Sequence, residues 1–109
     1  MSTYFQHDGG TGAIRSVSGN ASDALAAVFK AWVEPLKSIG MTLVTTGSPR
    51  QPPTSIGGTD STSFDAGGIL GIGFMQDPIE YGRWTHHSNM DVYERIQAPD
   101  LMKNAVIMA

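Results

Sequence analysis

An apolar stripe with helical spacing, within residues 25–39, limits most strongly what this chain can fold into. It consists of Leu25, Val28, Phe29, Trp32, Val33, Leu36 and Ile39. Because spacings of three and four residues place side chains on one face of an α-helix, the stripe predicts an amphipathic helix packed against a core. Gly40 suits the end of this helix, and Pro35 predicts a kink or a break into two short helices near Glu34.

Short β-branched or apolar segments occur on both sides of this helix. Strands are predicted at residues 3–7, 14–17, 41–46 and 69–74, and helical segments at 61–68, 90–96 and 98–109. The Pro- and Gly-rich stretch 47–60 predicts a long loop. Strands that alternate with helices indicate an α/β fold, and the length indicates a single domain over residues 1–109.

Composition excludes several classes of function. The net charge is −3 and the basic residues form no cluster, which argues against a nucleic-acid partner. No apolar run reaches the length of about 18 residues typical of a membrane span, and the first residues do not resemble a signal peptide. The absence of cysteine excludes disulfides and thiolate zinc sites, and leaves the compartment open.

Two adjacent histidines stand out in "RWTHHSNMD", residues 83–91, because the chain has three histidines in all. If this segment were extended, His86 and His87 would point to opposite sides and could not bind one ion together. Asp91, four residues after His87, would suit a helix start from which its carboxylate orients the imidazole of a metal ligand. The spacing leaves both a metal site and a polar surface loop open.

A second candidate is Asp60 in "GGTDSTSFD", where two glycines lead into a predicted helix. Asp is a common residue at the start of a helix, so Asp60 is either a cap or a functional side chain in a loop.

Together, these motifs resemble one family. The block "GGTDSTSFDAGGILGIGFMQDPIEYGRWTHHSNMDVYERI", residues 57–96, is similar to the C-terminal part of the catalytic domain of two-zinc exopeptidases of the aminopeptidase S and carboxypeptidase Q type. The segments "HDGGTGAIRSV" and "FKAWVEPLKSIG" also resemble this family, so the similarity covers nearly the whole chain.

The resemblance implies a partial mixed sheet with flanking helices, equivalent to the C-terminal portion of a zinc-exopeptidase domain of the phosphorylase/hydrolase-like type. By this resemblance His87 is a zinc ligand, and His86 donates a hydrogen bond to the tetrahedral intermediate. Asp60 then lies in the substrate-pocket loop, and Asp91 supports the ligand loop. Family members usually have His after GGTD, where this chain has Ser61.

The rest of the family's metal site has no counterpart in the sequence. A two-zinc site of this type needs an H-x-D pair, a bridging carboxylate and a Glu-Glu pair, whereas Glu34, Glu80 and Glu94 are isolated. Catalytic zinc needs about three protein ligands. We therefore expect the C-terminal fragment of a zinc-dependent aminopeptidase or dipeptidase, acting on peptides when intact and inactive by itself.

An alternative from a different class is a stand-alone, non-catalytic α/β module that binds a partner or itself. In either case a partial sheet exposes a strand edge and an apolar face, which recruit other chains. We therefore expect a homo-oligomer. Relatives of the resembled family are often exported, but the sequence leaves the compartment of this chain unassigned.

Overall fold

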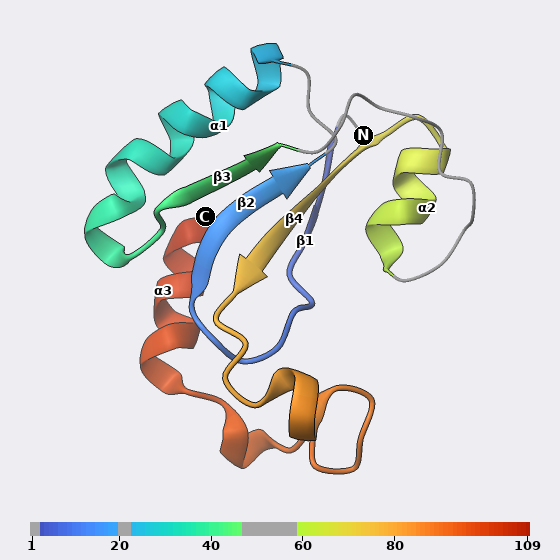
Figure 1. Cartoon of the computed structure of the whole chain (residues 1–109), viewed down its shortest axis with the longest axis vertical. Coiled ribbons are helices and arrows are strands. Elements are labelled where there is room, and N and C mark those ends of the chain that lie inside the picture. Colours follow the sequence, from blue (N-terminus) through green and yellow to red (C-terminus); the bar gives the residue numbers. More distant parts are fainter. Residues whose placement is uncertain (1–2, 20–22, 47–58) are drawn as a thin grey trace.

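A four-stranded mixed sheet lies at the centre of the structure (Figure 1). The computed structural model describes residues 3–19, 23–46 and 59–109, so most of the loop expected at 47–60 lies outside the described residues. The strands are β1 (Thr3–Gln6), β2 (Ile14–Gly19), β3 (Leu43–Thr46) and β4 (Leu70–Gln76), in the order β1-β4-β2-β3. Strand β4 is parallel to β1 and antiparallel to β2, and β2 is parallel to β3.

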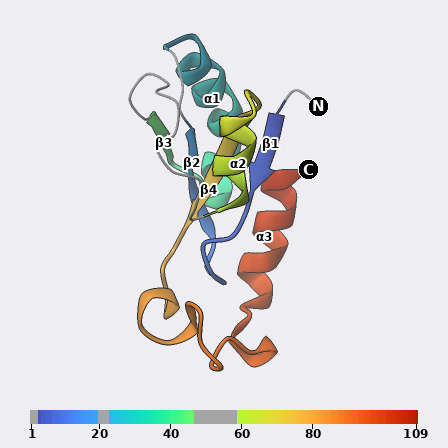
Figure 2. The same ribbon diagram turned by 90° about the vertical axis from the view of Figure 1, so that its right-hand side faces the viewer.

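Helices cover both faces of the sheet (Figures 1 and 2). They are α1 (Asp23–Leu36), α2 (Asp60–Ala66) and α3 (Ala98–Met108). Adjacent residues of a strand point to opposite faces: Tyr4 stacks on Phe64 of α2, whereas Phe5 packs against Trp32 of α1. The α/β class, with a mixed sheet and flanking helices, is therefore confirmed.

The core lies between the sheet and the helices α1 and α3. Its buried members are Ile14, Val17, Phe29, Val33, Met41 and Ile72, with Ile107 of α3 packed against them. The buried face of α1 is narrower than the predicted apolar stripe, because Phe29 and Val33 are buried while Trp32 is 48% exposed. Part of this apolar helix face is therefore accessible to solvent.

Most helices end close to where the sequence predicts. Helix α1 contains Pro35 in its last turn, and a short 3-10 helix (Lys37–Ile39) follows and ends at Gly40 with a φ of 99°. The break thus falls after Leu36 rather than near Glu34: α1 continues through Pro35, and the chain then tightens into 3-10 geometry, as helix ends often do. Helices α2 and α3 match the predicted segments 61–68 and 98–109.

The helix predicted over 90–96 is wrong. This segment contains a single 3-10 turn, Tyr93–Arg95, preceded by Val92 in an extended conformation. The Ser88 hydroxyl accepts a hydrogen bond from the backbone N–H of Met90 at 3.1 Å, and such local side-chain bonds compete with helix formation.

Across the described part of the chain, no helix has the length and apolar character that a membrane crossing requires.

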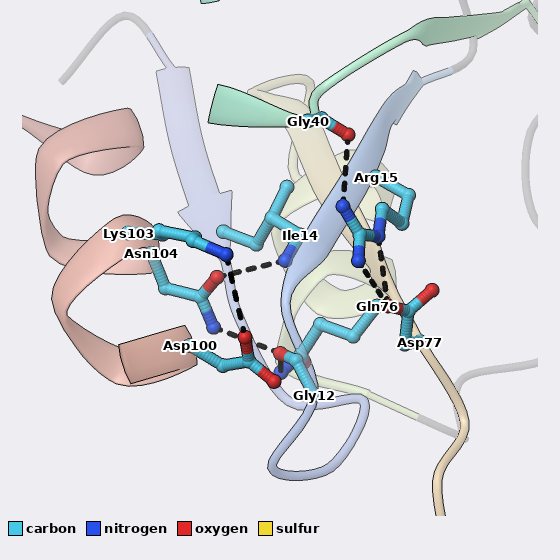
Figure 3. A network of polar contacts seen from close by, with 9 residues as sticks. All are labelled: Gly12, Ile14, Arg15, Gly40, Gln76, Asp77, Asp100, Lys103 and Asn104. Carbon is cyan, nitrogen blue, oxygen red and sulfur yellow. Dashed lines mark hydrogen bonds and ion pairs between the residues drawn. The ribbon is translucent and has the colours of Figure 1, made fainter. Parts of the chain in front are cut away.

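Two side-chain amides fasten the loop between β1 and β2 (Figure 3). Asn104 of α3, which is 2% exposed, accepts a hydrogen bond from the Ile14 N–H at 2.7 Å and donates one to the Gly12 carbonyl at 2.9 Å. Gln76, at the end of β4, donates to the same carbonyl at 2.8 Å and to that of Gly10 at 2.7 Å. The loop is therefore tied to both α3 and β4.

A partly exposed ion pair lies on the other side of β2 from Asn104 (Figure 3). The Arg15 guanidinium contacts the Asp77 carboxylate at 2.6 Å and donates to the Gly40 carbonyl at 3.3 Å. The hydrogen bond from Arg15 holds the pKa of Asp77 below its ordinary value. The stabilisation from this pair is thus present above the ordinary carboxyl pKa and is lost as the pH falls below it, and its exposure keeps the contribution below about 1 kcal/mol.

Replacement of Asn104 by Ala tests the loop attachment. We expect the free energy of unfolding to fall by about 2–3 kcal/mol, because the buried Ile14 N–H loses its partner. Lys103→Ala on the same helix is the matched control, since the ion pair of Lys103 with Asp100 among the described residues is long, at 3.9 Å, and partly exposed. Urea unfolding measures both variants, and equal losses would contradict the role given to Asn104.

Candidate functional site

The carboxyl ends of two neighbouring parallel strands meet at one edge of the sheet. Strand β1 runs parallel to β4 with Gln6 opposite Gly73, so the residues that follow both strands emerge on the same side. His7 and Asp8 come directly after β1, and the segment 77–91 follows β4. Ligand sites of open α/β sheets commonly lie outside the carboxyl ends of their strands.

A pocket of about 480 Å³ lies at this edge, and we call it the histidine pocket. All three histidines of the chain line it, although His7 is separated from the other two by most of the sequence. The side chains relevant to chemistry are those of His7, Asp8, Tyr81, His86, His87 and Asp91. Imidazole and carboxylate groups from two distant segments thus share one cavity.

The adjacent histidines are presented by an unusual turn. Residues Tyr81–Thr85 form one turn of π-helix, in which the His86 N–H donates to the Tyr81 carbonyl at 3.0 Å. His87 then adopts a left-handed backbone conformation with a φ of 54°. Such turns and conformations cost free energy and occur often at functional sites.

The two imidazoles do not point to opposite sides, as an extended segment would require. Their ring centroids lie 4.1 Å apart, and the His86 ring is 4.7 Å from that of Tyr81. The positive φ of His87 turns the backbone and brings its ring beside that of His86. The segment is a turn rather than a strand, so the condition for opposed side chains is not met, and both residues line the histidine pocket.

Asp91 lines the histidine pocket, but it does not begin a helix. Its backbone N–H donates to the Ser88 carbonyl at 3.3 Å within a turn. Between these two described residues, no hydrogen bond joins the Asp91 carboxylate to the His87 ring. A role for Asp91 in orienting His87 therefore stays a prediction.

An ion pair closes the segment that carries the adjacent histidines. The Arg95 guanidinium contacts the Glu80 carboxylate, which lies just before the π-helical turn. The Glu80 carbonyl also accepts hydrogen bonds from the N–H groups of Arg83 and Trp84, at 3.2 Å and 2.9 Å. The two ends of residues 80–95 are thus held together, which restrains the position of His86 and His87 between them.

Asp60 lies beside the histidine pocket rather than in it. It is the first residue of α2, and Thr59 occupies the cap position, so the interpretation of Asp60 as the cap is wrong. Its carboxylate accepts a hydrogen bond from the Tyr4 hydroxyl at 3.4 Å, and partial burial together with Asp60 raises the pKa of Tyr4. Asp60 lines a neighbouring pocket of about 450 Å³ that shares His7, Asp8 and Thr59 with the histidine pocket.

His7 and Asp8 are site residues that the sequence interpretation missed. Their sequence indicates the end of a strand and a Gly-rich turn, and nothing in it shows that β1 pairs with β4. One signal in the sequence could have indicated them: both residues directly follow a strand, where functional side chains of α/β proteins commonly lie. Burial lowers the pKa of His7, an effect that the nearby Asp8 carboxylate partly opposes.

Hydrogen bonds hold both residues in place. The Nε2 atom of His7 lies 3.2 Å from Nδ2 of Asn104. The Asp8 carboxylate accepts a hydrogen bond from Gln6 Nε2 at 3.4 Å, and the Asp8 carbonyl accepts one from the Tyr81 hydroxyl at 3.5 Å. The last contact joins the segment after β1 to the segment after β4.

The donor types fit zinc, but the donor set is incomplete. Imidazole nitrogens and carboxylate oxygens are the usual zinc ligands in proteins without thiolates. Among the described residues, however, no group of three or more His, Asp or Glu side chains lies close enough together to hold a metal ion. His87 and Asp8 can each supply one ligand atom, which is fewer than the three that catalytic zinc requires.

Comparison with known proteins gives no relative: no family model, no curated protein and no solved structure matches this chain.

Replacement of Gly12 by Ala tests how tightly the loop behind His7 and Asp8 is packed. A Cβ atom at this position would lie 2.1 Å from the Asp77 carbonyl oxygen, so the backbone must shift. We expect a loss of about 1–3 kcal/mol in the free energy of unfolding, the usual range for overpacking. Gly82→Ala is the matched control, because its Cβ would meet no atom within 4 Å. Urea unfolding compares the two, and an unaffected Gly12→Ala variant would contradict the close approach.

Proposed function

We propose that this chain supplies part of the active site of a zinc-dependent aminopeptidase or dipeptidase, which cleaves the peptide bond at a chain end. In this proposal the chain corresponds to the C-terminal portion of the catalytic domain. The observation that carries the proposal is the gathering of all three histidines and two carboxylates in one pocket at the carboxyl ends of β1 and β4. The sequence motifs around residues 57–96 support the same family.

Roles follow from the chemistry of the side chains. His87 is proposed as a zinc ligand through an imidazole nitrogen, and Asp8 as a second ligand through its carboxylate. Zinc, when bound, activates water and polarises the carbonyl that is attacked. His86, beside the Tyr81 ring, is proposed to donate a hydrogen bond to the oxygen that becomes negatively charged.

Asp60 is proposed to act on the substrate rather than on the metal. It lines the pocket next to the histidine pocket, and its carboxylate is held by the Tyr4 hydroxyl. A carboxylate there can accept hydrogen bonds from the backbone or the amino group of a bound peptide. The shared wall formed by His7 and Asp8 would join this substrate pocket to the metal.

The chain alone is proposed to be inactive. The general base and the remaining ligands of a two-zinc site have no counterpart in the sequence, so they would come from other polypeptide. Zinc binding by the isolated chain is therefore expected to be measurable but weak, because too few ligands surround the ion.

Zinc titration of two neighbouring histidine variants tests this proposal. In isothermal titration calorimetry, His87→Gln is expected to weaken zinc binding at least about tenfold, which corresponds to about 1.4 kcal/mol. His86→Gln is the matched control, since the same substitution one residue away removes no proposed ligand. Equal affinities of the two variants would contradict the assignment of His87.

A peptidase assay tests the second half of the proposal. Hydrolysis of leucine p-nitroanilide by the purified chain with zinc is expected to stay at background. Rapid zinc-dependent turnover by the chain alone would contradict the view that the site is incomplete.

A second candidate, self-association, is favoured by a separate observation. A groove of about 580 Å³ lies between α1, α3 and β1, and every described residue that lines it is apolar. Phe5, Trp32 and Val106 in this groove are 45%, 48% and 61% exposed. Exposed apolar surface of this kind marks interaction sites, and we propose that a second copy of the chain covers it.

Two substitutions on α3 test self-association. Val106→Lys places a charge in the groove, whereas Met102→Lys changes a side chain of similar exposure, 65%, that does not line it. Sedimentation velocity is expected to show a dimer for the wild type and for Met102→Lys, and a monomer for Val106→Lys. A monomeric wild type would contradict this proposal.

A further inference from the structure

We propose that Asn104 is a positioning residue for the histidine pocket: it holds the His7 ring in the tautomer with the proton on Nδ1 and occupies the lone pair of Nε2. His7 is thereby kept from binding a metal ion and acts instead as a hydrogen-bond donor. The metal part of this inference rests on the proposed function, whereas the tautomer part does not.

The orientation of the Asn104 side-chain amide is fixed by two backbone groups. The Ile14 N–H is a donor, so the atom 2.7 Å from it must be the amide oxygen. The Gly12 carbonyl is an acceptor, so the atom 2.9 Å from it must be the amide nitrogen. Backbone groups have fixed roles, and the usual ambiguity between the two amide atoms therefore does not arise.

The third contact of the amide then determines the protonation of His7. One hydrogen of Asn104 Nδ2 is used by the Gly12 carbonyl, and the second is directed to His7 Nε2 at 3.2 Å. A nitrogen that accepts a hydrogen bond carries a lone pair and no proton. The neutral His7 ring therefore has its proton on Nδ1.

The environment favours this neutral form. A charged ring would place an N–H group against the amide hydrogen of Asn104. The acidic groups that share its two pockets are Asp8, Asp60 and Asp91, and α3 carries Asp100 and Lys103.

The chemical consequence separates His7 from the other two histidines. A metal ion needs the lone pair of a ring nitrogen, and in His7 one lone pair is used by Asn104 while the other nitrogen is protonated. The Nδ1–H group can instead donate to a carbonyl or carboxylate oxygen, the groups that a bound peptide offers. His7 thus adds a donor of fixed polarity to a pocket that also holds proposed metal ligands.

Long-range ¹H–¹⁵N correlation spectroscopy of the uniformly labelled full chain tests this inference. At a pH about one unit above the ordinary histidine pKa of about 6.5, it distinguishes the two neutral tautomers and the imidazolium. The His7 signals are assigned by their loss in His7→Gln, which keeps an acceptor for Asn104. The expected result is the Nδ1–H pattern for His7, unchanged when zinc is added, while the His87 signals move.

The outcomes separate this inference from the proposed function. An Nε2–H pattern or an even mixture at His7 in the zinc-free wild type would overturn the inference. Zinc binding at the His7 ring would also overturn it, even if His87 responds as proposed. If His7 keeps the Nδ1–H pattern and zinc moves no histidine signal, the inference holds and the zinc proposal fails.

A variant at the positioning residue gives a readout that a purely structural role would not move. Asn104→Asp replaces the donor by a carboxylate oxygen, and the His7 proton is then expected on Nε2. Lys103→Ala, on the same helix, is expected to leave the tautomer unchanged. An unchanged His7 pattern in folded Asn104→Asp would contradict the role of Asn104, and the wild-type pattern decides the question should that variant not fold.

Discussion

The Gly12 carbonyl accepts hydrogen bonds from two side-chain amides, and the arrangement of the site depends on this contact (Figure 3). Gln76 reaches it from the end of β4, and Asn104 reaches it from α3. The loop that carries His7 and Asp8 is thereby tied to the central strand that precedes the adjacent histidines. A Cβ atom on Gly12 would collide with the Asp77 carbonyl, so the contact also requires glycine at this position.

Local signals in the sequence predicted most of the elements, because their causes lie within a few residues. The spacing of Phe29 and Val33 predicted a buried face on α1, and Gly40 predicted the end of the helical stretch, where the 3-10 helix after α1 stops at a positive φ. The helix expected over 90–96 failed because the Ser88 hydroxyl and the extended Val92 favour turns over helix. The sequence did not predict which strands pair, because β1 and β4 lie side by side although more than sixty residues separate them in the chain.

The same limit applies to the site. His86, His87 and Asp91 were found because they lie together in the sequence, and they line one pocket. His7 and Asp8 were missed because only the pairing of β1 with β4 brings them there. Asp60 was found, but it lies in the adjoining pocket, with Tyr4 as its partner. The left-handed conformation of His87, which turns both imidazoles to one side, had no signal in the residue types.

The three histidines share one pocket at the carboxyl ends of β1 and β4. Titration with Co²⁺, a paramagnetic ion that accepts the same imidazole and carboxylate ligands, tests it most directly when the histidine ring signals are followed by NMR. The ring signals of His7, His86 and His87 are expected to broaden together, while the Trp32 indole signal on α1 stays sharp. A His7 signal that stays as sharp as that of Trp32, while His87 broadens, would contradict the shared pocket.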